Sequence, residues 1–588
     1  MAQKLPHKDV VIIGLGWTAS ILANELTDEG LEVVAIERGP WRDTGTDFNI
    51  NYVQDELRYG IRLDLFQRPT QDTVTFRNNG DQTALPVRQF GSFLPGNGVG
   101  GAGVHWNGHT WRFLPSDFRC RSHLEERYGA NFIPSELSIQ DWGVTYEEME
   151  ASYDKFEYLA GISGQAGNLN GQQTGHGNPF EGPRKRDYPQ GPLPMNYGPT
   201  IFAEAARKCG YHPFPTPAAN SSGFYTNPLG LTMGPCTMCG FCERFACANY
   251  SKASAQVNVL PHLMQKSNFE ARTNCEVMKI NLDSTGKKAT GVTYVDSSGE
   301  EWEQTADLVI SCAFIFENVR LLMLSGIGEI YDPKTQKGTI GRNYAYQTNS
   351  GIQMFFDDKN FNPFIAAGAL GQSVDDFNGD NFDHSGLDFV GGSGFNCIPT
   401  NARPILNRPT PPGTPKWGSE WKKATKDHYL STLSYSLQGS SYASPGNHLD
   451  MDPAYTDRFG RPLMRMTFDF PDNDIRMTSY CTDKAAEIAK QLNPKQMVVS
   501  KRKKPYSVVP YQSTHNTGGA IMGTDPTKSA LNRYLQSWDV PNLFVIGANA
   551  FPQNAGYNPT GTVGALAFWA AEAIRTQYLK NPGALVQA

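Results

Sequence analysis

The chain has 588 residues, of which 39% are hydrophobic, and its formal net charge is −6. A chain of this length exceeds one simple core and predicts two interleaved domains. The negative charge argues against a general nucleic-acid binder, and no apolar run approaches the ~20 residues of a membrane-spanning helix.

The first forty residues predict a strand, a tight turn, a helix and a second strand. The first strand covers 10–13, the helix covers 20–29, and the second strand covers 32–36. The apolar run at 10–13 leads directly into the turn without a cleavage site, so we expect no signal peptide.

The turn carries a dinucleotide-binding fingerprint. Gly14 permits the turn, Gly16 lets the backbone approach a pyrophosphate, and Ala19 takes the third, close-packing position. Glu37 ends the second strand and can accept hydrogen bonds from ribose hydroxyls. Because strand, helix, second strand and terminal acid occur together, the segment predicts a bound dinucleotide.

A second glycine-rich segment covers 94–106. It contains Gly98, Gly100 and Gly101 and ends in His105 and Trp106. So many glycines indicate backbone pressed against a flat or phosphorylated ligand. The alternative, a flexible surface loop, is disfavoured by the hydrophobic residues that flank the glycines.

Four cysteines lie within twelve residues, in the spacing C-x2-C-x2-C-x4-C, namely Cys236, Cys239, Cys242 and Cys247. The tight spacing of the first three is typical of iron–sulfur ligation. Structural zinc sites usually have two separated ligand pairs, and disulfides between such close residues would be strained. The residues leave open a four-iron cluster, or a three-iron cluster with one free cysteine.

The remaining segments predict a mixture of strands and helices. We expect β-hairpins at 269–283 and 290–304, a buried strand at 306–313 and a helix at 318–325. Region 345–500 alternates aromatic strands with Gly, Pro and Asn turns, which is typical of an antiparallel sheet. Further predicted elements are a helix at 146–158, a strand at 542–548 and a helix at 561–578.

This order of segments resembles the glucose–methanol–choline (GMC) oxidoreductases along nearly the whole chain. The fingerprint, 96–103, 322–328, 341–343 and 515–567 carry the resemblance. The cysteine cluster is similar to that of the bacterial dehydrogenase branch, which acts on gluconate, 2-ketogluconate, fructose, sorbitol and glucose. Within this branch, the chain most resembles the large FAD-containing subunits of membrane-bound gluconate 2-dehydrogenases, through 141–144, 233–236, 250–254 and 529–539.

The resemblance implies a mixed α/β fold with FAD as the cofactor. A discontinuous Rossmann-like FAD-binding domain would carry an interleaved substrate-binding domain that is built on an antiparallel sheet. The expected FAD-binding domain comprises 1–113, 227–344 and 501–588, with the iron–sulfur segment at 234–254, and the substrate-binding domain comprises 114–226 and 345–500.

The resemblance also implies the catalytic residues. His515 matches the family's active-site histidine, and a neutral imidazole can remove the hydroxyl proton as hydride departs. Asn558 stands where the family has His or Asn, and it can hydrogen-bond the substrate oxygen. Gly547 and Ala548 end a strand near the flavin, and Thr560 starts a helix whose N-terminus would stabilise the reduced flavin.

Two features remain open within the family pattern. His105 resembles a histidine that can be bonded covalently to the flavin, with His109 as the alternative. Related dehydrogenases have a C-x5-C pair and a third cysteine after a short gap, which implies a 3Fe-4S cluster held by Cys236, Cys242 and Cys247. Cys239 is then either a free thiol or an alternative ligand.

The implied activity is oxidation of a sugar acid, D-gluconate at C2, with electrons passing through the cluster to a multihaem cytochrome c subunit and quinone. A small subunit with an export signal would bring the chain to the periplasmic face of the bacterial inner membrane, where it would be peripheral. The alternatives are a dehydrogenase for 2-ketogluconate, sorbitol or another polyol, a soluble GMC oxidase that reduces oxygen, and a non-catalytic assembly with structural zinc.

Overall fold

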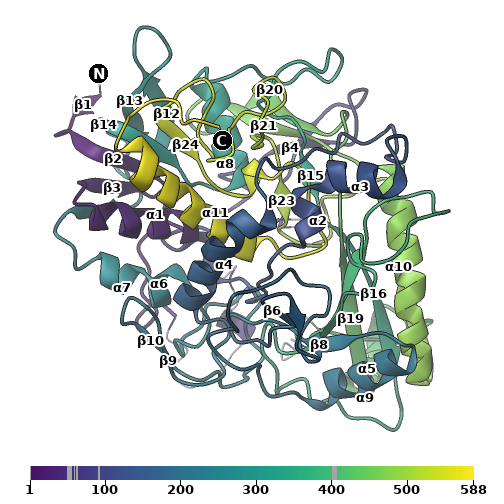
Figure 1. The fold of residues 1–588 in the computed structure, drawn as a ribbon. Coiled ribbons are helices and arrows are strands. Elements are labelled where there is room, and N and C mark those ends of the chain that lie inside the picture. The colour runs from purple at the N-terminus through teal and green to yellow at the C-terminus, as the bar shows by residue number, and fades with distance from the viewer. Residues whose placement is uncertain are drawn as a thin grey trace.

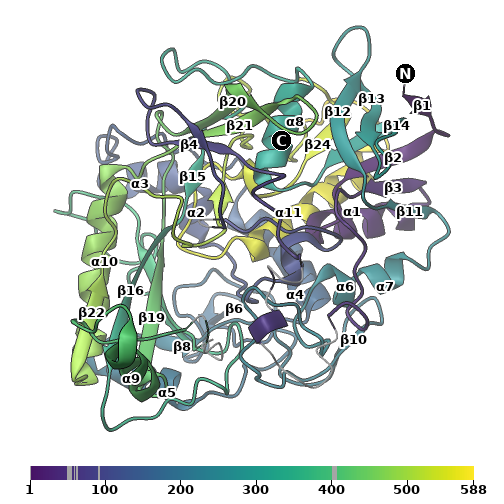
Figure 2. The same ribbon diagram turned by 180° about the vertical axis from the view of Figure 1, so that it is seen from behind.

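The computed structural model of the chain describes residues 2–48, 56–58, 60, 64–90, 93–399, 405 and 407–587. Two large sheets dominate these residues and lie in different parts of the molecule (Figures 1 and 2). The first sheet has eight strands and takes them from both ends and the middle of the chain. The second sheet has six strands, most of which come from 348–500.

The first sheet has the order β11-β3-β2-β14-β13-β12. Its parallel part contains β2 (Lys8–Ile13), β3 (Val33–Ile36) and β11 (Phe269–Arg272). All four residues of β3 are buried, as expected of a parallel strand that is covered on both faces. The strands predicted at 10–13 and 32–36 therefore exist, and β2 begins two residues earlier than expected.

A single long strand, β14 (Glu301–Ser311), joins the two halves of this sheet. Its first half pairs antiparallel with β13 (Ala289–Val295), which in turn pairs with β12 (Glu276–Leu282). Its second half pairs in parallel with β2 and with β24 (Leu543–Val545). A short strand, β1 (Gln3–Lys4), also pairs with β14.

Three helices pack together, and α1 (Trp17–Asp28) joins them to this sheet through contacts with β2 and β3. Helix α11 (Thr560–Ala573) contacts both α1 and α4 (Tyr146–Ala160), and Figure 1 shows it between them. Helix α8 (Ile315–Leu324) packs on β12. The N-termini of α1 and α11 thus come from opposite ends of the chain and lie in one region of the fold.

The second sheet has the order β22-β16-β19-β18-β17-β8, and every neighbouring pair is antiparallel. Its strands are β22 (Gln496–Ser500), β16 (Thr348–Phe355), β19 (Thr432–Gly439), β18 (Ser393–Cys397), β17 (Gln372–Val374) and β8 (Pro213–Pro215). This mixed α/β architecture with a second, antiparallel sheet confirms the predicted fold class. The domain boundaries remain a prediction.

The reading of 345–500 as strands and turns was incomplete, because this region contains the 20-residue helix α10 (Asp472–Gln491). The side of α10 that faces β16 buries Met477, Cys481 and Ala485, which recur every four residues. This helical period is present in the sequence, but the aromatic residues of the surrounding region favoured an interpretation as strands. Helix α5 (Tyr197–Lys208) packs beside α10.

A smaller sheet of four strands brings 75–86 against 448–467. Its order is β20-β21-β4-β5, with β20 (His448–Thr456), β21 (Pro462–Thr467), β4 (Thr75–Arg77) and β5 (Leu85–Pro86). The remaining short helices are α2 (Pro115–Phe118), α3 (Cys120–Tyr128), α6 (Ala255–Asn258), α7 (Leu260–Leu263) and α9 (Gly418–His428). The remaining strand pairs are β6 (Asn168–Leu169) with β7 (Gln172–Gln173), β9 (Tyr225–Thr226) with β10 (Thr232–Met233), and β15 (Ala345–Tyr346) with β23 (Asn516–Thr517).

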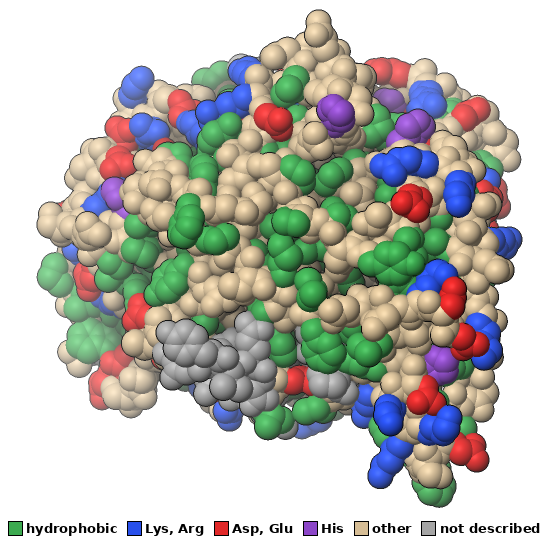
Figure 3. All heavy atoms as spheres, turned by 90° about the horizontal axis from the view of Figure 1, so that it is seen from below, with side chains coloured by type: hydrophobic (Ala, Val, Ile, Leu, Met, Phe, Trp, Pro, Cys, Tyr) green, Lys and Arg blue, Asp and Glu red, His purple; other side chains and the backbone are tan. Residues whose placement is uncertain are grey.

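Within the described ranges, no helix combines the length and the apolar character needed to cross a bilayer. On the face seen in Figure 3, Lys and Arg side chains lie mainly towards the edges, beside Asp and Glu, and hydrophobic groups occupy much of the centre. The described residues therefore form no continuous basic surface on this face.

Candidate active site

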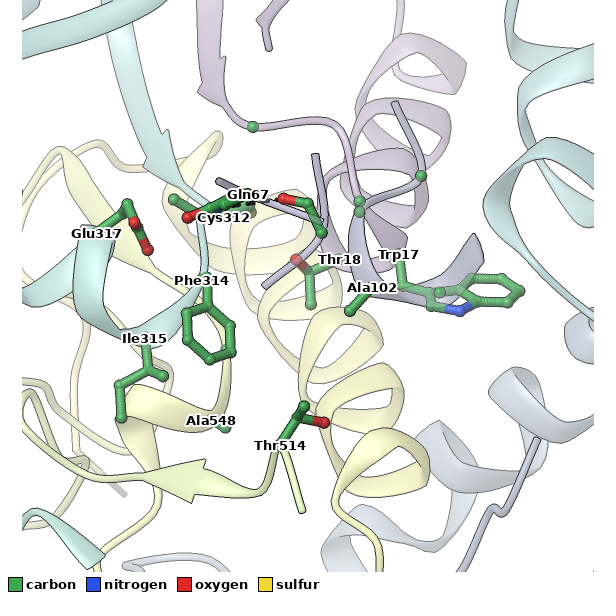
Figure 4. A pocket seen from close by; sticks show the side chains of 18 of the residues that line it. Trp17, Thr18, Gln67, Ala102, Cys312, Phe314, Ile315, Glu317, Thr514 and Ala548 are labelled. Atoms are coloured by element: carbon green, nitrogen blue, oxygen red, sulfur yellow. Dashed lines mark hydrogen bonds between the residues drawn. The ribbon is translucent and has the colours of Figure 1, made fainter. Parts of the chain in front are cut away.

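A cavity of about 340 Å³ lies between the N-terminal turn, the second glycine-rich turn and the C-terminal segment. Figure 4 shows Thr18 and Ala102 on one side of it, Phe314 and Ile315 on the other, and Thr514 below them. Thirteen predicted site residues line this cavity: Gly14, Gly16, Glu37, Gly98, Gly100, Gly101, His105, Trp106, His515, Gly547, Ala548, Asn558 and Thr560.

The N-terminal turn has the backbone of a dinucleotide site. Gly14 has a φ of +89°, and a Cβ there would lie 3.0 Å from the carbonyl oxygen of Cys312. The Glu37 carboxylate accepts hydrogen bonds from the N–H groups of Leu15 at 2.9 Å and Gly39 at 2.8 Å. Burial raises the pKa of Glu37, and these two bonds oppose the shift. The carboxylate thus braces the turn and lines the cavity.

Ala19 does not line the cavity. It is fully buried in α1, which begins directly after Gly16. A small side chain at this position lets the helix pack closely on the strand, which is the role predicted for it.

The second glycine-rich turn packs directly against the first. A Cβ on Gly39 would lie 2.1 Å from the backbone nitrogen of Gly98, so no larger residue fits there without movement. Gly98 and Gly100 have φ values of +113° and +88°, in the left-handed region that favours glycine. The N–H of Gly100 donates to the carbonyl of Leu15 at 2.7 Å. The two turns together form one wall of the cavity.

His105 lies on this wall with one ring nitrogen free. Its Nε2 is buried and has no hydrogen-bond partner in the part of the chain that the structure describes. Its ring packs edge-on against Phe66 at a centroid distance of 4.4 Å. Burial, followed by the positive charge of Lys252, lowers the pKa of His105 to about 3. A neutral imidazole with an unpaired nitrogen on the cavity is compatible with covalent attachment of a flavin.

His515 and Asn558 meet at the other end of the cavity. Asn558 Nδ2 lies 3.3 Å from His515 Nε2, although the two residues are 43 positions apart. Burial, followed by the nearby ring of His109, lowers the pKa of His515 to about 3. The imidazole is therefore neutral near pH 7, which a general base requires.

Three neighbours of this pair were not assigned to catalysis from the sequence. Gln347 Oε1 lies 2.5 Å from His515 Nδ1, and the indole N–H of Trp111 donates to Asn558 Oδ1 at 3.1 Å. His109, predicted only as an alternative flavin attachment residue, lines the cavity near His515. No motif marks these residues, because their role depends on segments that meet only in the folded chain.

The N-terminus of α11 closes this end of the cavity. Thr560 is the first residue of the helix, and no side chain caps it. A Cβ on Gly561 would lie 2.2 Å from the carbonyl oxygen of Trp111, so glycine allows the helix to approach the segment that carries Trp111. Uncapped N–H groups and the helix dipole favour negative charge here. The glycine turns, Glu37 and this helix end together fit a dinucleotide cofactor with an anionic ring system.

The four cysteines lie beside the cavity rather than on it. The adjoining residues Glu243 and Arg244 do line the cavity, and the N–H of Arg244 donates to the carbonyl of His105 at 2.8 Å. The ammonium of Lys252, which is buried, donates to the carbonyls of Trp106 at 2.6 Å and Cys242 at 2.9 Å. These bonds fix the cysteine loop to the glycine-rich wall.

None of the four cysteines forms a disulfide with a described residue, and two of them accept hydrogen bonds at sulfur. Asn220 Nδ2 donates to the sulfur atoms of Cys242 at 3.5 Å and Cys236 at 3.9 Å, and the N–H of Met238 donates to Cys236 at 3.4 Å. Among the residues that can be described, no three His, Cys, Asp or Glu side chains converge closely enough to hold a single metal ion. Cysteine thiols with N–H donors around them are chemically suitable ligands for an iron–sulfur cluster. The described residues of the loop do not form a binding site for a single metal ion.

Comparisons with known proteins agree with this geometry. Family models described as GMC oxidoreductase match residues 201–349 and 444–567. The gluconate 2-dehydrogenase flavoprotein of Pantoea cypripedii is 51% identical over 595 residues, which cover 100% of this chain and 97% of that protein. The fructose dehydrogenase large subunit of Gluconobacter japonicus is 24% identical, covering 98% and 99%. The crystal structure of pyridoxine 4-oxidase from Mesorbium loti shares the fold, with a TM-score of 0.58 and 17% identity over 97% of this chain and 99% of that one.

Proposed function

The chain belongs to the GMC oxidoreductase family, as its sequence predicted, and from this premise we propose that it oxidises the C2 hydroxyl of D-gluconate to 2-keto-D-gluconate. The observation that supports gluconate as the substrate is the 51% identity, along the full chain, to a gluconate 2-dehydrogenase flavoprotein. The family implies FAD, which when bound supplies the two-electron acceptor for the hydride.

The cavity residues divide between cofactor and substrate in this proposal. Gly14, Gly16 and Glu37 would hold the adenosine half of FAD, and Gly98, Gly100 and Gly101 would bind the rest of it. At the other end of the cavity, Gly547, Ala548 and the N-terminus of α11 at Thr560 would stabilise the flavin ring system. His105, with Trp106 beside it, is the proposed point of covalent attachment. The support is that all of these residues line one cavity.

His515 is the proposed base, and Asn558 its partner. The substrate hydroxyl would lie in front of His515 Nε2 and Asn558 Nδ2, within hydrogen-bond reach of both, and would replace their direct 3.3 Å contact. The imidazole takes the hydroxyl proton at Nε2, while the amide donates a hydrogen bond to the same oxygen and fixes the carbinol carbon. Because burial keeps the ring neutral, the base is ready without a prior deprotonation step.

The cysteine loop is the proposed electron exit. Cys236, Cys242 and Cys247 would hold a 3Fe-4S cluster, and Cys239 would be a free thiol or an alternative ligand. The support is the spacing of the cysteines, the N–H groups directed at Cys236 and Cys242, and the bonds that tie the loop to the cavity wall. Such N–H donors are typical surroundings of iron–sulfur thiolates.

The proposed partners follow from the resemblance of the sequence. A membrane-anchored multihaem cytochrome c subunit would take the electrons and pass them to quinone, and a small subunit would supply the export signal. The chain would then be peripheral at the periplasmic face of the bacterial inner membrane. The Pantoea cypripedii relative is a gluconate 2-dehydrogenase flavoprotein, and its name is compatible with the flavin-carrying subunit of such a complex.

Steady-state oxidation with an artificial acceptor tests the proposal. Gluconate, 2-ketogluconate, sorbitol, fructose and glucose are compared with a dye as acceptor and, separately, with oxygen alone. We expect the highest kcat/KM with gluconate and dye, and little peroxide. Preference for a neutral sugar would overturn the substrate, and rapid peroxide formation without dye would favour an oxidase.

A further inference from the structure

The side chain of Gln347 has a fixed orientation behind the catalytic pair. It lies between β15 and β16 and is fully buried. Its Nε2 donates to the carbonyl of Ala555 at 3.0 Å and to the carbonyl of Tyr557 at 2.8 Å. Both amide hydrogens are therefore used. Rotating the amide by 180° would place its oxygen against two carbonyl oxygens, so this orientation is strongly disfavoured.

This orientation decides which nitrogen of His515 carries the proton. Gln347 Oε1 is an acceptor only, and it lies 2.5 Å from His515 Nδ1. A contact this short requires a hydrogen on Nδ1. A neutral imidazole has only one such hydrogen, and burial keeps the ring neutral. His515 Nε2 therefore carries a lone pair.

The orientation of Asn558 follows in the same way from Trp111. An indole N–H can only donate, and it lies 3.1 Å from Asn558 Oδ1. The amide nitrogen of Asn558 must then face His515 Nε2, at 3.3 Å. Without substrate the Asn558 amide therefore donates to the lone pair of His515 Nε2. A substrate hydroxyl that displaces this bond meets an acceptor, Nε2, and a donor, Nδ2, next to each other. A hydroxyl group needs this combination if it is to lose its proton and keep a hydrogen bond to its oxygen.

We propose that Gln347 is a positioning residue that holds His515 in the Nδ1–H tautomer, and that Trp111 orients Asn558 in the same manner. This proposal rests on the proposed role of His515 as base. The substrate O–H bond breaks and its proton goes to Nε2, while the carbinol C–H bond breaks and its electron pair leaves with the hydride to FAD. The resulting imidazolium still donates from Nδ1 to Gln347 Oε1, so the contact persists through the reaction.

Two variants of Gln347 and one matched control test the proposal. Gln347→Leu removes the acceptor, and we expect kcat to fall about tenfold or more with little change in KM, within the range of general-base effects. Gln347→Glu keeps an acceptor towards Nδ1, and its second oxygen, which meets the carbonyls of Ala555 and Tyr557, must carry a proton to be accommodated there. We therefore expect Gln347→Glu to retain more of kcat than Gln347→Leu. Gln353→Leu, in β16 and six residues further along the chain, should change neither kcat nor KM.

A second readout does not depend on turnover. Ring-nitrogen NMR of protein labelled with 15N-histidine, with the His515 signals assigned by their loss in His515→Asn, reports the tautomer directly. We expect a protonated Nδ1 and a bare Nε2 in the wild type, and a changed tautomer ratio in Gln347→Leu. An Nε2–H tautomer in the wild type would overturn the proposal. So would an unchanged kcat in Gln347→Leu.

The failure of the base assignment is distinguishable from the failure of this inference. If His515→Asn retains wild-type activity, the proposed function of His515 is wrong. If His515→Asn is inactive while both Gln347 variants behave like the Gln353→Leu control, only the positioning role is wrong. Retention of flavin absorbance in each variant establishes that the site has folded.

Discussion

The pH dependence of turnover follows from the burial of His515. Its pKa is lowered to about 3, and a base works only in its neutral form. At pH 5, a histidine with an ordinary pKa of about 6.5 would be roughly 3% neutral, whereas a pKa of about 3 leaves about 99% neutral. We therefore expect kcat/KM for gluconate to change by less than about twofold between pH 8 and pH 5, against the roughly thirtyfold loss expected of an unshifted histidine.

The assay is steady-state kinetics with a dye acceptor from pH 4.5 to pH 9. Asp375, whose pKa burial raises to about 7, accepts a hydrogen bond from Tyr557, so the profile is repeated with Asp375→Asn to remove this second titration. Enzyme held at pH 5 and returned to pH 7 must recover full activity. A tenfold loss per pH unit below pH 6.5 in both proteins would refute the reasoning.

Three further predictions concern the cofactor groups. Glu37→Gln places an amide N–H against the N–H of Leu15 or Gly39, so we expect FAD affinity, measured by reconstitution of apoprotein, to fall at least about tenfold; unchanged affinity would contradict the bracing role. Acid precipitation should release the flavin from His105→Ala but not from the wild type. Release of flavin from the wild type as well would exclude covalent attachment. Cys242→Ser should lose iron and acid-labile sulfide but keep flavin absorbance, and equal iron in both proteins would remove Cys242 from the ligand set.

The N-terminal unit could be predicted closely because its signals are local. The apolar strands, Gly14 and the acid at Glu37 lie within about forty residues, and hydrogen bonds within the same unit hold them. By contrast, β14 was predicted as two separate strands. It is one strand with two environments, because it pairs antiparallel at its start and in parallel at its end.

Helix α10 was missed although its sequence contains a helical period. Met477, Cys481 and Ala485 are buried and recur every four residues. Asp483 and Lys490 lie on the exposed side. The aromatic segments of 345–500 favoured an interpretation as strands, and this period within them was overlooked.

The residues of the proposed catalytic site also differ in whether the sequence could predict them. His515 and Asn558 could be predicted from their resemblance to family motifs, and their roles stay a prediction although the structure brings them together. Gln347 and Trp111 could not be predicted, because each acts through a contact more than 160 positions away. Only the folded chain shows which amide atoms of Gln347 and Asn558 face His515.

Anaerobic stopped-flow reduction of the holoenzyme by D-gluconate tests the central claim most directly. The account predicts rapid bleaching of the flavin absorbance, slowed by deuterium at C2 of gluconate and slowed by at least about a hundredfold in His515→Asn. Flavin that gluconate does not bleach, or that bleaches equally fast with the deuterated substrate and in His515→Asn, would contradict it.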